Sequence, residues 1–301
     1  MPGLHDLAAP AKLNLFLHVT GRREDGYHLL QSVFMLIDWC DELDVETRND
    51  GQLIRHDHGA RLPDDDLCLR AAQLLKTECG ATLGCDIHIR KQLPWGAGMG
   101  GGSSDAATVL LALNQLWGLH WSRDRLATLA LQLGADVPFF VQGHNAWVEG
   151  IGERITPLNL PDVLLRTPIA LLKPPVAVPT QAIFGSPALR RDTEHAIVAD
   201  FLAAPQRFGR NDLQAPAEHY SSQVGQALAV MQNRFGNSRM TGSGSTVFSW
   251  MPLTAESPAH AHNHEAPSFS AADVGLDDTA WVSRVTHGLD RHPLLDRLPS
   301  P

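Results

Sequence analysis

The stretch Pro94-Trp-Gly-Ala-Gly-Met-Gly-Gly-Gly-Ser-Ser104 decides the fold of this chain. Five of the nine residues at positions 96–104 are glycine, the residue that loses the most backbone entropy on folding. A simple turn needs fewer, so this density indicates positive φ angles and a backbone that approaches a ligand closely. A strand pattern precedes the loop and a helical pattern follows it, so several N–H groups and a helix N-terminus converge on one point. Such an arrangement binds phosphate.

Three other kinds of glycine loop disagree with the surrounding residues. Gly96, Gly98 and Gly101 do form G-x-G-x-x-G, the dinucleotide fingerprint. However, Pro94 interrupts the preceding strand, residues 116–121 carry no acidic side chain for a ribose, and the βαβαβ alternation is missing. A P-loop requires a lysine that this loop lacks. The protein-kinase signatures HRD and DFG are also absent from the sequence.

The hydrophobic patterns predict an α/β fold in which the first ninety residues are mostly strand. The expected strands there are residues 12–20, 29–36, 43–47 and 85–89. The expected helices are residues 67–78, opened by Asp65 and Asp66, then 106–117, ended by Gly118, and 122–133, ended by Gly134. We expect Ser103 or Ser104 to cap the second of these helices and Asp105 to lie in its first turn.

The pattern restarts beyond residue 164, which predicts a boundary between a domain of residues 1–160 and one of residues 161–301. The second part is expected to hold strands at 169–173 and 281–285 and helical segments at 180–184 and 194–203. Residues 254–270 are of low complexity. Their alternating histidines offer ligands to a transition metal, but the missing companion ligands favour a disordered surface insertion.

Composition limits the classes of function. The chain has 301 residues, 44% of them hydrophobic and 19% charged, an ordinary globular balance. We expect no membrane partner, since no stretch approaches the roughly 18 apolar residues of a membrane span. We also expect no signal peptide at the N-terminus, hence a cytoplasmic protein. The four cysteines fit no zinc template and are expected to be reduced. The net charge of −9 argues against a nucleic-acid partner.

The extended motif Pro94-x-Gly-Ala-Gly-Met-Gly-Gly-Gly-Ser-Ser-Asp-Ala-Ala107 resembles the phosphate-binding motif of the GHMP small-molecule kinases. Two further stretches, Ala9-Pro-Ala-Lys-Leu-Asn14 and Met240-Thr-Gly-Ser-Gly-Ser-Thr-Val-Phe248, resemble the other motifs of that superfamily. Gly26-Tyr-His28 and Gly134-Ala-Asp-Val-Pro-Phe139 narrow the resemblance to members that act on a cytidyl diphosphate substrate.

The resemblance implies a two-lobed α/β (α+β) fold. Its N-terminal domain would be similar to the second domain of ribosomal protein S5, and its C-terminal domain would be ferredoxin-like. ATP and substrate would meet in the cleft between the lobes, with Mg²⁺ as the metal. The implied reaction transfers the γ-phosphoryl group of ATP to the 2-hydroxyl of a cytidyl diphosphate alcohol in isoprenoid precursor synthesis. The partner is then a small molecule, and the chain is a monomer or a homodimer.

The resemblance also assigns roles on the substrate side. Asp136 matches the catalytic carboxylate that accepts the hydroxyl proton; whether it removes the proton early or only orients the hydroxyl stays open. Lys12 matches the second catalytic position, where its ammonium would hold Asp136 ionised. Tyr27 and His28 match the residues that recognise cytosine, by stacking and by hydrogen bonds. The residues implied to line the substrate are Asn14 and Thr180. Asn14 is polar in an apolar strand, so it needs a partner if buried.

On the ATP side, the resemblance implies binding by the loop and by a lysine before it. These residues are Lys91, Pro94, Trp95, Gly96, Ala97, Gly98, Met99, Gly100, Gly101, Gly102, Ser103 and Ser104. Ser104 is also the implied contact to Mg²⁺. A second backbone cradle near the phosphates would come from Gly242, Ser243 and Gly244.

The sequence departs from the family pattern at Asp66, which stands where an asparagine is usual near the adenine pocket, and in residues 254–270. Two alternatives stay open. One is a GHMP kinase for another alcohol, such as homoserine, mevalonate or a sugar. The other is a non-catalytic RNA-binding module, which the acidic net charge opposes because such binding needs clustered Lys and Arg.

Overall fold

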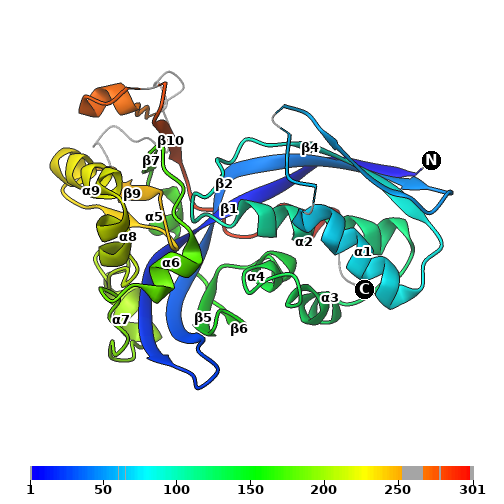
Figure 1. Cartoon of the computed structure of the whole chain (residues 1–301), viewed down its shortest axis with the longest axis horizontal. Coiled ribbons are helices and arrows are strands. Elements are labelled where there is room, and N and C mark those ends of the chain that lie inside the picture. Colours follow the sequence, from blue (N-terminus) through cyan, green and yellow to red (C-terminus); the bar gives the residue numbers. More distant parts are fainter. Residues whose placement is uncertain (1, 60, 65, 253–266, 278, 299–301) are drawn as a thin grey trace.

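The computed structural model describes residues 2–59, 61–64, 66–252, 267–277 and 279–298. The insertion predicted at residues 254–270 lies mostly outside the described residues. Two sheets, each with its own helices, form the two lobes in Figure 1. The α/β class predicted from the sequence is confirmed.

The larger sheet is built on a long antiparallel pair, β1 (Gly3–Arg22) and β2 (His28–Arg48). Its remaining strands are β3 (Leu53–Asp57), β4 (Gly84–Arg90), β5 (Ala146–Gly150) and β6 (Arg154–Pro157), in the order β3-β4-β2-β5-β6. The two strands predicted at 29–36 and 43–47 are therefore the two ends of one strand. β5 pairs with its first part and β4 with its second, which changes the neighbours and the burial pattern halfway.

Four helices cover one face of this sheet in Figure 1: α1 (Leu67–Cys79), α2 (Gly101–Leu116), α3 (Arg123–Ala130) and α4 (Val137–Gln142). α2 is the central one, and its residues 104–113 are all buried. Asp66 caps α1 as expected, accepting a hydrogen bond from the Leu69 amide at 3.0 Å. The helix predicted to end at residue 133 ends at Ala130, and a turn follows it.

The smaller sheet is antiparallel, in the order β10 (Val282–Thr286), β7 (Ile169–Lys173), β9 (Val247–Trp250) and β8 (Arg239–Met240). The helical segments of this part are α5 (Asp162–Arg166), α6 (Thr180–Gly185), α7 (Val198–Ala203), α8 (Gln214–Tyr220), α9 (Ser222–Phe235), a 3₁₀ turn (Ala271–Val274) and α10 (Leu294–Arg297). The strand predicted at 169–173 is confirmed, and the one at 281–285 lies one residue later. Of the helical segment predicted at 194–203, only the second part is helix.

β1 and β2 join the lobes. Figure 1 shows both strands leaving the first sheet and running beside α6 and α7. Leu17 and Val19 of β1 accordingly lie in the apolar core of the second lobe, with Leu172 and Val247. In the other direction, Leu294 of α10 packs into the core of the first lobe. The division at residue 160 stays a prediction. Within the described residues, no helix combines the length and the apolar character that a membrane crossing requires.

Candidate active site

The glycine loop leads directly into α2 and leans on a second glycine loop. Gly100, with φ of 72°, immediately precedes the helix, so the first amides of α2 point toward the loop. Gly98, also with φ of 72°, lies so close to the second loop that a Cβ on it would stand 2.5 Å from the Thr241 carbonyl oxygen. The amide of Ser245 donates to the Gly96 carbonyl at 3.3 Å. Two backbones thus pack without side chains between them.

A first cavity of about 370 Å³ lies between α1 and the glycine loop. Leu62, Pro63, Leu67 and Cys68 form its apolar side. The predicted ATP-binding residues on its wall are Lys91, Pro94, Trp95, Gly96, Ala97, Gly98, Met99, Gly100, Gly101, Gly102 and Ser103. An apolar wall opposite a row of backbone amides suits a flat base that carries phosphates.

A second cavity of about 350 Å³ lies on the other side of the same loop. Gly96, Gly98 and Gly100 line both cavities, so the loop is the wall they share. The second cavity brings together the other predicted residues Lys12, Asn14, Asp136, Thr180, Gly242, Ser243 and Gly244. A group held on the loop amides from one side is therefore open to attack from the other.

Lys12 and Asp136 face each other in the second cavity. The Nζ of Lys12 lies 3.5 Å from Oδ2 of Asp136 and also donates to Oδ1 of Asn14. Lys12 is only 3% exposed, and its ammonium lies 4.3 Å from the centre of the Phe34 ring. Asp136 precedes α4 without capping it, and its side chain is 32% exposed. A fixed cation thus stands beside a carboxylate that a ligand can reach.

Hydrogen bonds hold the neighbours of this pair. Asn14 is buried and has the hydrogen-bond partners that the sequence required. Its side-chain Nδ2 donates to Ser32 Oγ at 2.9 Å, and its backbone amide donates to Thr241 Oγ1 at 2.9 Å. Thr180 Oγ1 shares a hydrogen bond of 2.8 Å with Ser243 Oγ. The two lobes therefore meet at the cavity through defined polar contacts.

Tyr27 and His28 lie at the turn between β1 and β2 and do not line the second cavity. His28 stacks on Phe184, which does line it, with ring centroids 5.1 Å apart and planes 27° apart. Burial, followed by the charges of Arg191 and Arg22, lowers the pKa of His28. The side chain of the neighbouring Tyr27 is exposed to solvent. The two predicted base-recognition residues thus stand at the Phe184 end of the cavity.

Lys91 lines the first cavity, but its ammonium is held by two carboxylates. It contacts Oδ2 of Asp105 at 2.6 Å and also Asp41. Burial lowers the pKa of Lys91, yet the charges of Asp105 and Asp41 outweigh it and raise the pKa overall. Asp41 also accepts a hydrogen bond from the Leu93 amide at 2.8 Å. Lys91 therefore links the start of the glycine loop to α2.

The expected capping of α2 by Ser103 or Ser104 is wrong. The cap position is Gly100, with no side-chain cap hydrogen bond, because the helix begins before the serines. Asp105 accordingly lies beyond the first turn. Oγ of Ser104 and Oδ1 of Asp105 are buried and have no hydrogen-bond partner among the described residues. Ser104 is fully buried and is absent from the walls of both cavities.

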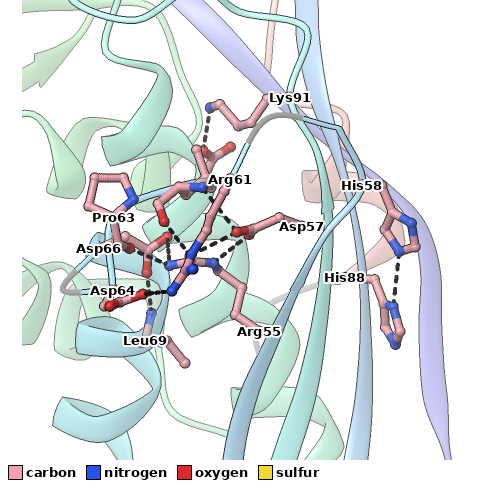
Figure 2. Close-up of polar contacts among 12 residues, drawn as sticks. Arg55, Asp57, His58, Arg61, Pro63, Asp64, Asp66, Leu69, His88 and Lys91 are labelled. Carbon is pink, nitrogen blue, oxygen red and sulfur yellow. Dashed lines mark hydrogen bonds and ion pairs between the residues drawn. The ribbon is translucent and has the colours of Figure 1, made fainter.

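Asp66 lines the first cavity, yet its own protein contacts engage both of its oxygens. Besides capping α1, it pairs with Nη1 of Arg55 at 2.9 Å. Figure 2 shows the Arg55 guanidinium between Asp57 and Asp66 and beside the segment of Pro63. Arg55 also donates to the carbonyls of Pro63, at 2.9 Å, and Leu62, at 3.1 Å. Arg55 therefore holds the segment of Leu62 and Pro63, the apolar edge of the first cavity, in place beside Asp57 and Asp66.

Comparisons with known proteins agree with this geometry. Residues 66–144 match the family model of the GHMP kinases N terminal domain. The 4-diphosphocytidyl-2-C-methyl-D-erythritol kinase of Methylibium petroleiphilum is 60% identical over 294 residues, which cover 98% of each chain. The enzyme of the same name from Paracidovorax citrulli is 50% identical over 98% of this chain and 97% of its own. The chain belongs to the 4-diphosphocytidyl-2-C-methyl-D-erythritol kinases.

A solved structure of a 4-(cytidine 5'-diphospho)-2C-methyl-D-erythritol kinase is 34% identical and superposes with a TM-score of 0.73, over 94% of this chain and 100% of that one. A homoserine kinase from Cytophaga hutchinsonii, 15% identical over 97% of this chain and 96% of its own, has a TM-score of 0.66 and shares the fold alone. The family and the kinase fold predicted from the sequence are confirmed.

Some residues of this kinase site gave no usable signal in the sequence. Asp41 lies on a long strand, where the sequence does not distinguish it from an ordinary polar position, and Asp105 was predicted only as part of the helix after the loop, not as the partner of Lys91. Arg55 interrupts the apolar pattern of the short strand β3, and no strand was predicted there for the same reason. Phe184 fits the apolar side of a short helix. Arg191 lies in a polar stretch beside another arginine. Their importance comes from contacts between distant segments.

Proposed function

We propose that this chain transfers the γ-phosphoryl group of ATP to the 2-hydroxyl of 4-diphosphocytidyl-2-C-methyl-D-erythritol, a step in isoprenoid precursor synthesis by the non-mevalonate pathway. One observation carries the proposal. The glycine loop is the common wall of two cavities, and the Lys12–Asp136 pair stands in the second one. Phosphoryl transfer needs donor and acceptor on opposite sides of the transferred group, in line with one another.

Each cavity then holds one reactant. The base of ATP lies against the apolar edge of the first cavity, and its phosphates lie on the amides of the glycine loop and the N-terminus of α2. In the second cavity, Asp136 accepts the proton of the attacking hydroxyl or orients that hydroxyl. Lys12 offsets charge on the transferring group, at a site where its ammonium is already fixed beside Asp136.

The rest of the second cavity suits the remainder of the substrate. Asn14 and Thr180 present polar groups beside the reacting pair. At the far end, Phe184, His28 and the exposed Tyr27 offer aromatic surfaces for the cytosine ring. Gly242, Ser243 and Gly244 line the second cavity next to Gly98 of the phosphate-binding loop, where they would form the second backbone cradle.

Mg²⁺ is the metal that this reaction calls for, and the lining of the first cavity offers it an oxygen ligand in Asp105. Oγ of Ser104 and Oδ1 of Asp105 are buried oxygens with no partner among the described residues, at the start of the helix that follows the phosphate loop. Mg²⁺ binds oxygen ligands and commonly takes most of them from phosphates and water. Asp105 would hold it with the phosphates of ATP, whereas Ser104, the contact predicted from the sequence, is fully buried and lines neither cavity. The metal would supply charge neutralisation on the phosphate oxygens.

We place the enzyme in the cytoplasm, acting on a small molecule as a monomer or a homodimer. The four free cysteines support a reducing compartment. The net charge of −9 supports a site that meets anionic substrates through local groups such as Lys12 and the loop amides.

Product analysis tests the reaction itself. The purified chain is incubated with Mg-ATP and the cytidyl substrate, and the mixture is followed by ³¹P NMR. We expect ADP and one new phosphomonoester, coupled to the carbon that carries the 2-hydroxyl. A phosphomonoester on a different hydroxyl, or ADP release without phosphorylated substrate, would contradict the proposal.

A further inference from the structure

Arg191 lies between α6 and α7 and is tied to the backbone around it. Its Nη2 donates to the carbonyls of Phe184 and Ser186, each at 3.0 Å, and its Nη1 donates to that of Leu189 at 3.0 Å. These three bonds fix the plane of the guanidinium, which is half-buried. A fourth donor, Nε–H, points at Nε2 of His28 at 3.0 Å.

The last of these contacts determines where His28 carries its proton. Arginine stays protonated in proteins and has no acceptor atom, so the Nε–H of Arg191 must be the donor. Nε2 of His28 is therefore the acceptor and carries no hydrogen. A neutral imidazole then has its proton on Nδ1. No hydrogen bond to Nδ1 of His28 occurs among the described residues, so this donor is left for a ligand.

We propose that Arg191 is a positioning residue for base recognition, which holds His28 in its Nδ1–H form and in its stack on Phe184. His28 then offers a single, oriented hydrogen-bond donor at the rim of the second cavity. The group it suits is a hydrogen-bond acceptor on the edge of a pyrimidine, such as O2 or N3 of cytosine. This inference rests on the proposed function, because it deepens the recognition of the same substrate.

The geometry couples the base pocket to the backbone that carries it. Arg191 bonds the carbonyl of Phe184 and the ring of His28 at once, so the two aromatic partners are held by one guanidinium. A lysine in its place has no planar fork to reach both. The neighbouring Arg190 makes no such link: its side chain is 57% exposed and pairs with the exposed Asp192 at 3.1 Å. Arg190 is therefore a matched control.

The tautomer is measured first, on the whole chain without substrate. Protein labelled with ¹⁵N-histidine is studied by long-range ¹H–¹⁵N correlation at pH 7.5, and His28 is assigned by its loss in His28→Gln. We expect an unprotonated Nε2 and a protonated Nδ1 in the wild type and in Arg190→Met, and a larger share of the Nε2–H form in Arg191→Met. A wild-type His28 with its proton on Nε2 overturns the inference, and that result needs no variant to fold.

Kinetics then test the positioning role. In Arg191→Met the KM for the cytidyl substrate should rise about tenfold, which corresponds to the loss of one oriented hydrogen bond between His28 and the base. The kcat and the KM for ATP should stay within about twofold of the wild type, which a general loss of structure would not allow. Arg190→Met should leave all three constants unchanged. An unchanged KM for the cytidyl substrate in Arg191→Met, or an equal fall in ATP binding, overturns the inference.

Wild-type activity and the tautomer of His28 separate the enzyme's activity from the role of Arg191. If the chain does not act on the cytidyl substrate, the wild-type activity is missing while the tautomer of His28 is still as expected. If Arg191 has no positioning role, the wild-type activity is present and Arg191→Met behaves like Arg190→Met.

Discussion

Lys12 comes from the middle of β1 and Asp136 from the turn before α4, and they meet in the wall of one cavity. A buried ammonium is costly unless it is paired, and Lys12 is paired with Asp136, Asn14 and the face of Phe34. The cost of burying this charge is then offset in the folded protein, and the charge is in place before any substrate binds. Such preorganisation is what electrostatic catalysis requires.

Asp136→Asn keeps the size of the side chain and removes the charge. We expect kcat to fall by roughly 10² or more, the usual contribution of a general base, with the affinity for ATP nearly unchanged. Steady-state assays and calorimetric ATP titration measure the two. Asp162→Asn on α5, where the carboxylate is exposed, is the control. A variant that keeps more than about a tenth of wild-type kcat would argue against the role of Asp136 as base.

Lys12→Met removes the cation and keeps the length of the side chain. Because the ammonium stands within 3.5 Å of Asp136, we expect kcat to fall by roughly 10²–10³, the usual effect of losing one preorganised donor. Lys76→Met on α1, away from both cavities, should keep full activity. Circular dichroism of both variants separates catalysis from folding. Near-normal turnover in a folded Lys12→Met enzyme would remove Lys12 from the mechanism.

At the scale of single residues, the sequence was informative where a motif surrounded the residue. Asn14 was noticeable by itself, since it is polar within an apolar strand, and its buried hydrogen bonds explain why it is there. Lys12 and Asp136 were each indistinguishable from a surface charge until the neighbouring residues were considered. Arg191 was not predictable, because its role depends on His28, a residue that lies far away in the chain.

Among the elements, the two glycine loops depend on each other. A Cβ at Gly98 would stand 2.5 Å from the Thr241 carbonyl, and the φ of 72° disfavours any other residue. Gly98→Ala should therefore weaken ATP binding at least tenfold and lower stability by about 1–3 kcal/mol. Gly225→Ala in α9 has room for its Cβ and should leave ATP binding unchanged. Calorimetric titration and urea unfolding give both quantities; full ATP affinity in Gly98→Ala would contradict the packing described above.

Arg55 joins Asp57 and Asp66 to the apolar edge of the first cavity. Arg55→Met leaves Asp57 and Asp66 unpaired and frees the carbonyls of Leu62 and Pro63, which edge the first cavity. We expect the KM for ATP to rise about tenfold or more, with the KM for the cytidyl substrate unchanged.

The control is a second arginine near the same edge. Arg61 pairs with Asp64 in full solvent, with side chains 82% and 86% exposed, so Arg61→Met should have no effect on either KM. Equal effects of Arg55→Met and Arg61→Met, or a rise in both KM values for Arg55→Met, would show that Arg55 does not act on the ATP cavity in particular.

Elements with a clear period and a stop signal were predictable, and those defined by pairing were not. The helix after Asp66 has both a cap and an apolar stripe, so its range was nearly correct. β2 was divided in two because its partners change along its length. The start of α2 was misplaced because glycine, rather than serine, occupies the cap. α9 received no prediction, although Val224, Leu228 and Met231 show a helical spacing.

At the scale of the whole molecule, α10 packs against the first lobe, and His292, which lies just before this helix, is buried. Burial, and then the charge of Arg123, lowers the pKa of His292 to about 3. The unfolded chain takes up this proton near pH 6.5, whereas the folded chain does so only near pH 3. The contribution of the neutral, buried His292 to the free energy of unfolding is therefore complete above pH 6.5, and it is lost as the pH falls from 6.5 toward 3. At pH 5.5 the loss amounts to about 1.4 kcal/mol.

Urea unfolding at pH 7.5 and pH 5.5 tests this. In the wild type, Nδ1 of His292 accepts a hydrogen bond from the Leu294 amide at 3.1 Å. His292→Asn keeps an acceptor for this amide but cannot take up a proton. We expect the wild type to lose about 1.4 kcal/mol more between the two pH values than this variant does. His195→Gln, at an exposed position, should behave like the wild type. The same pH dependence in His292→Asn and the wild type would mean that another group is responsible.

The most direct test of the whole account is a comparison of alcohol substrates under one set of conditions. ADP release is measured with Mg-ATP and, in turn, the cytidyl substrate, mevalonate, homoserine and galactose, and kcat/KM is determined for each. We predict turnover with 4-diphosphocytidyl-2-C-methyl-D-erythritol and at least a thousandfold lower kcat/KM with the other three, since none carries a base for His28 and Phe184. Equal or greater kcat/KM with any of the three would contradict the account.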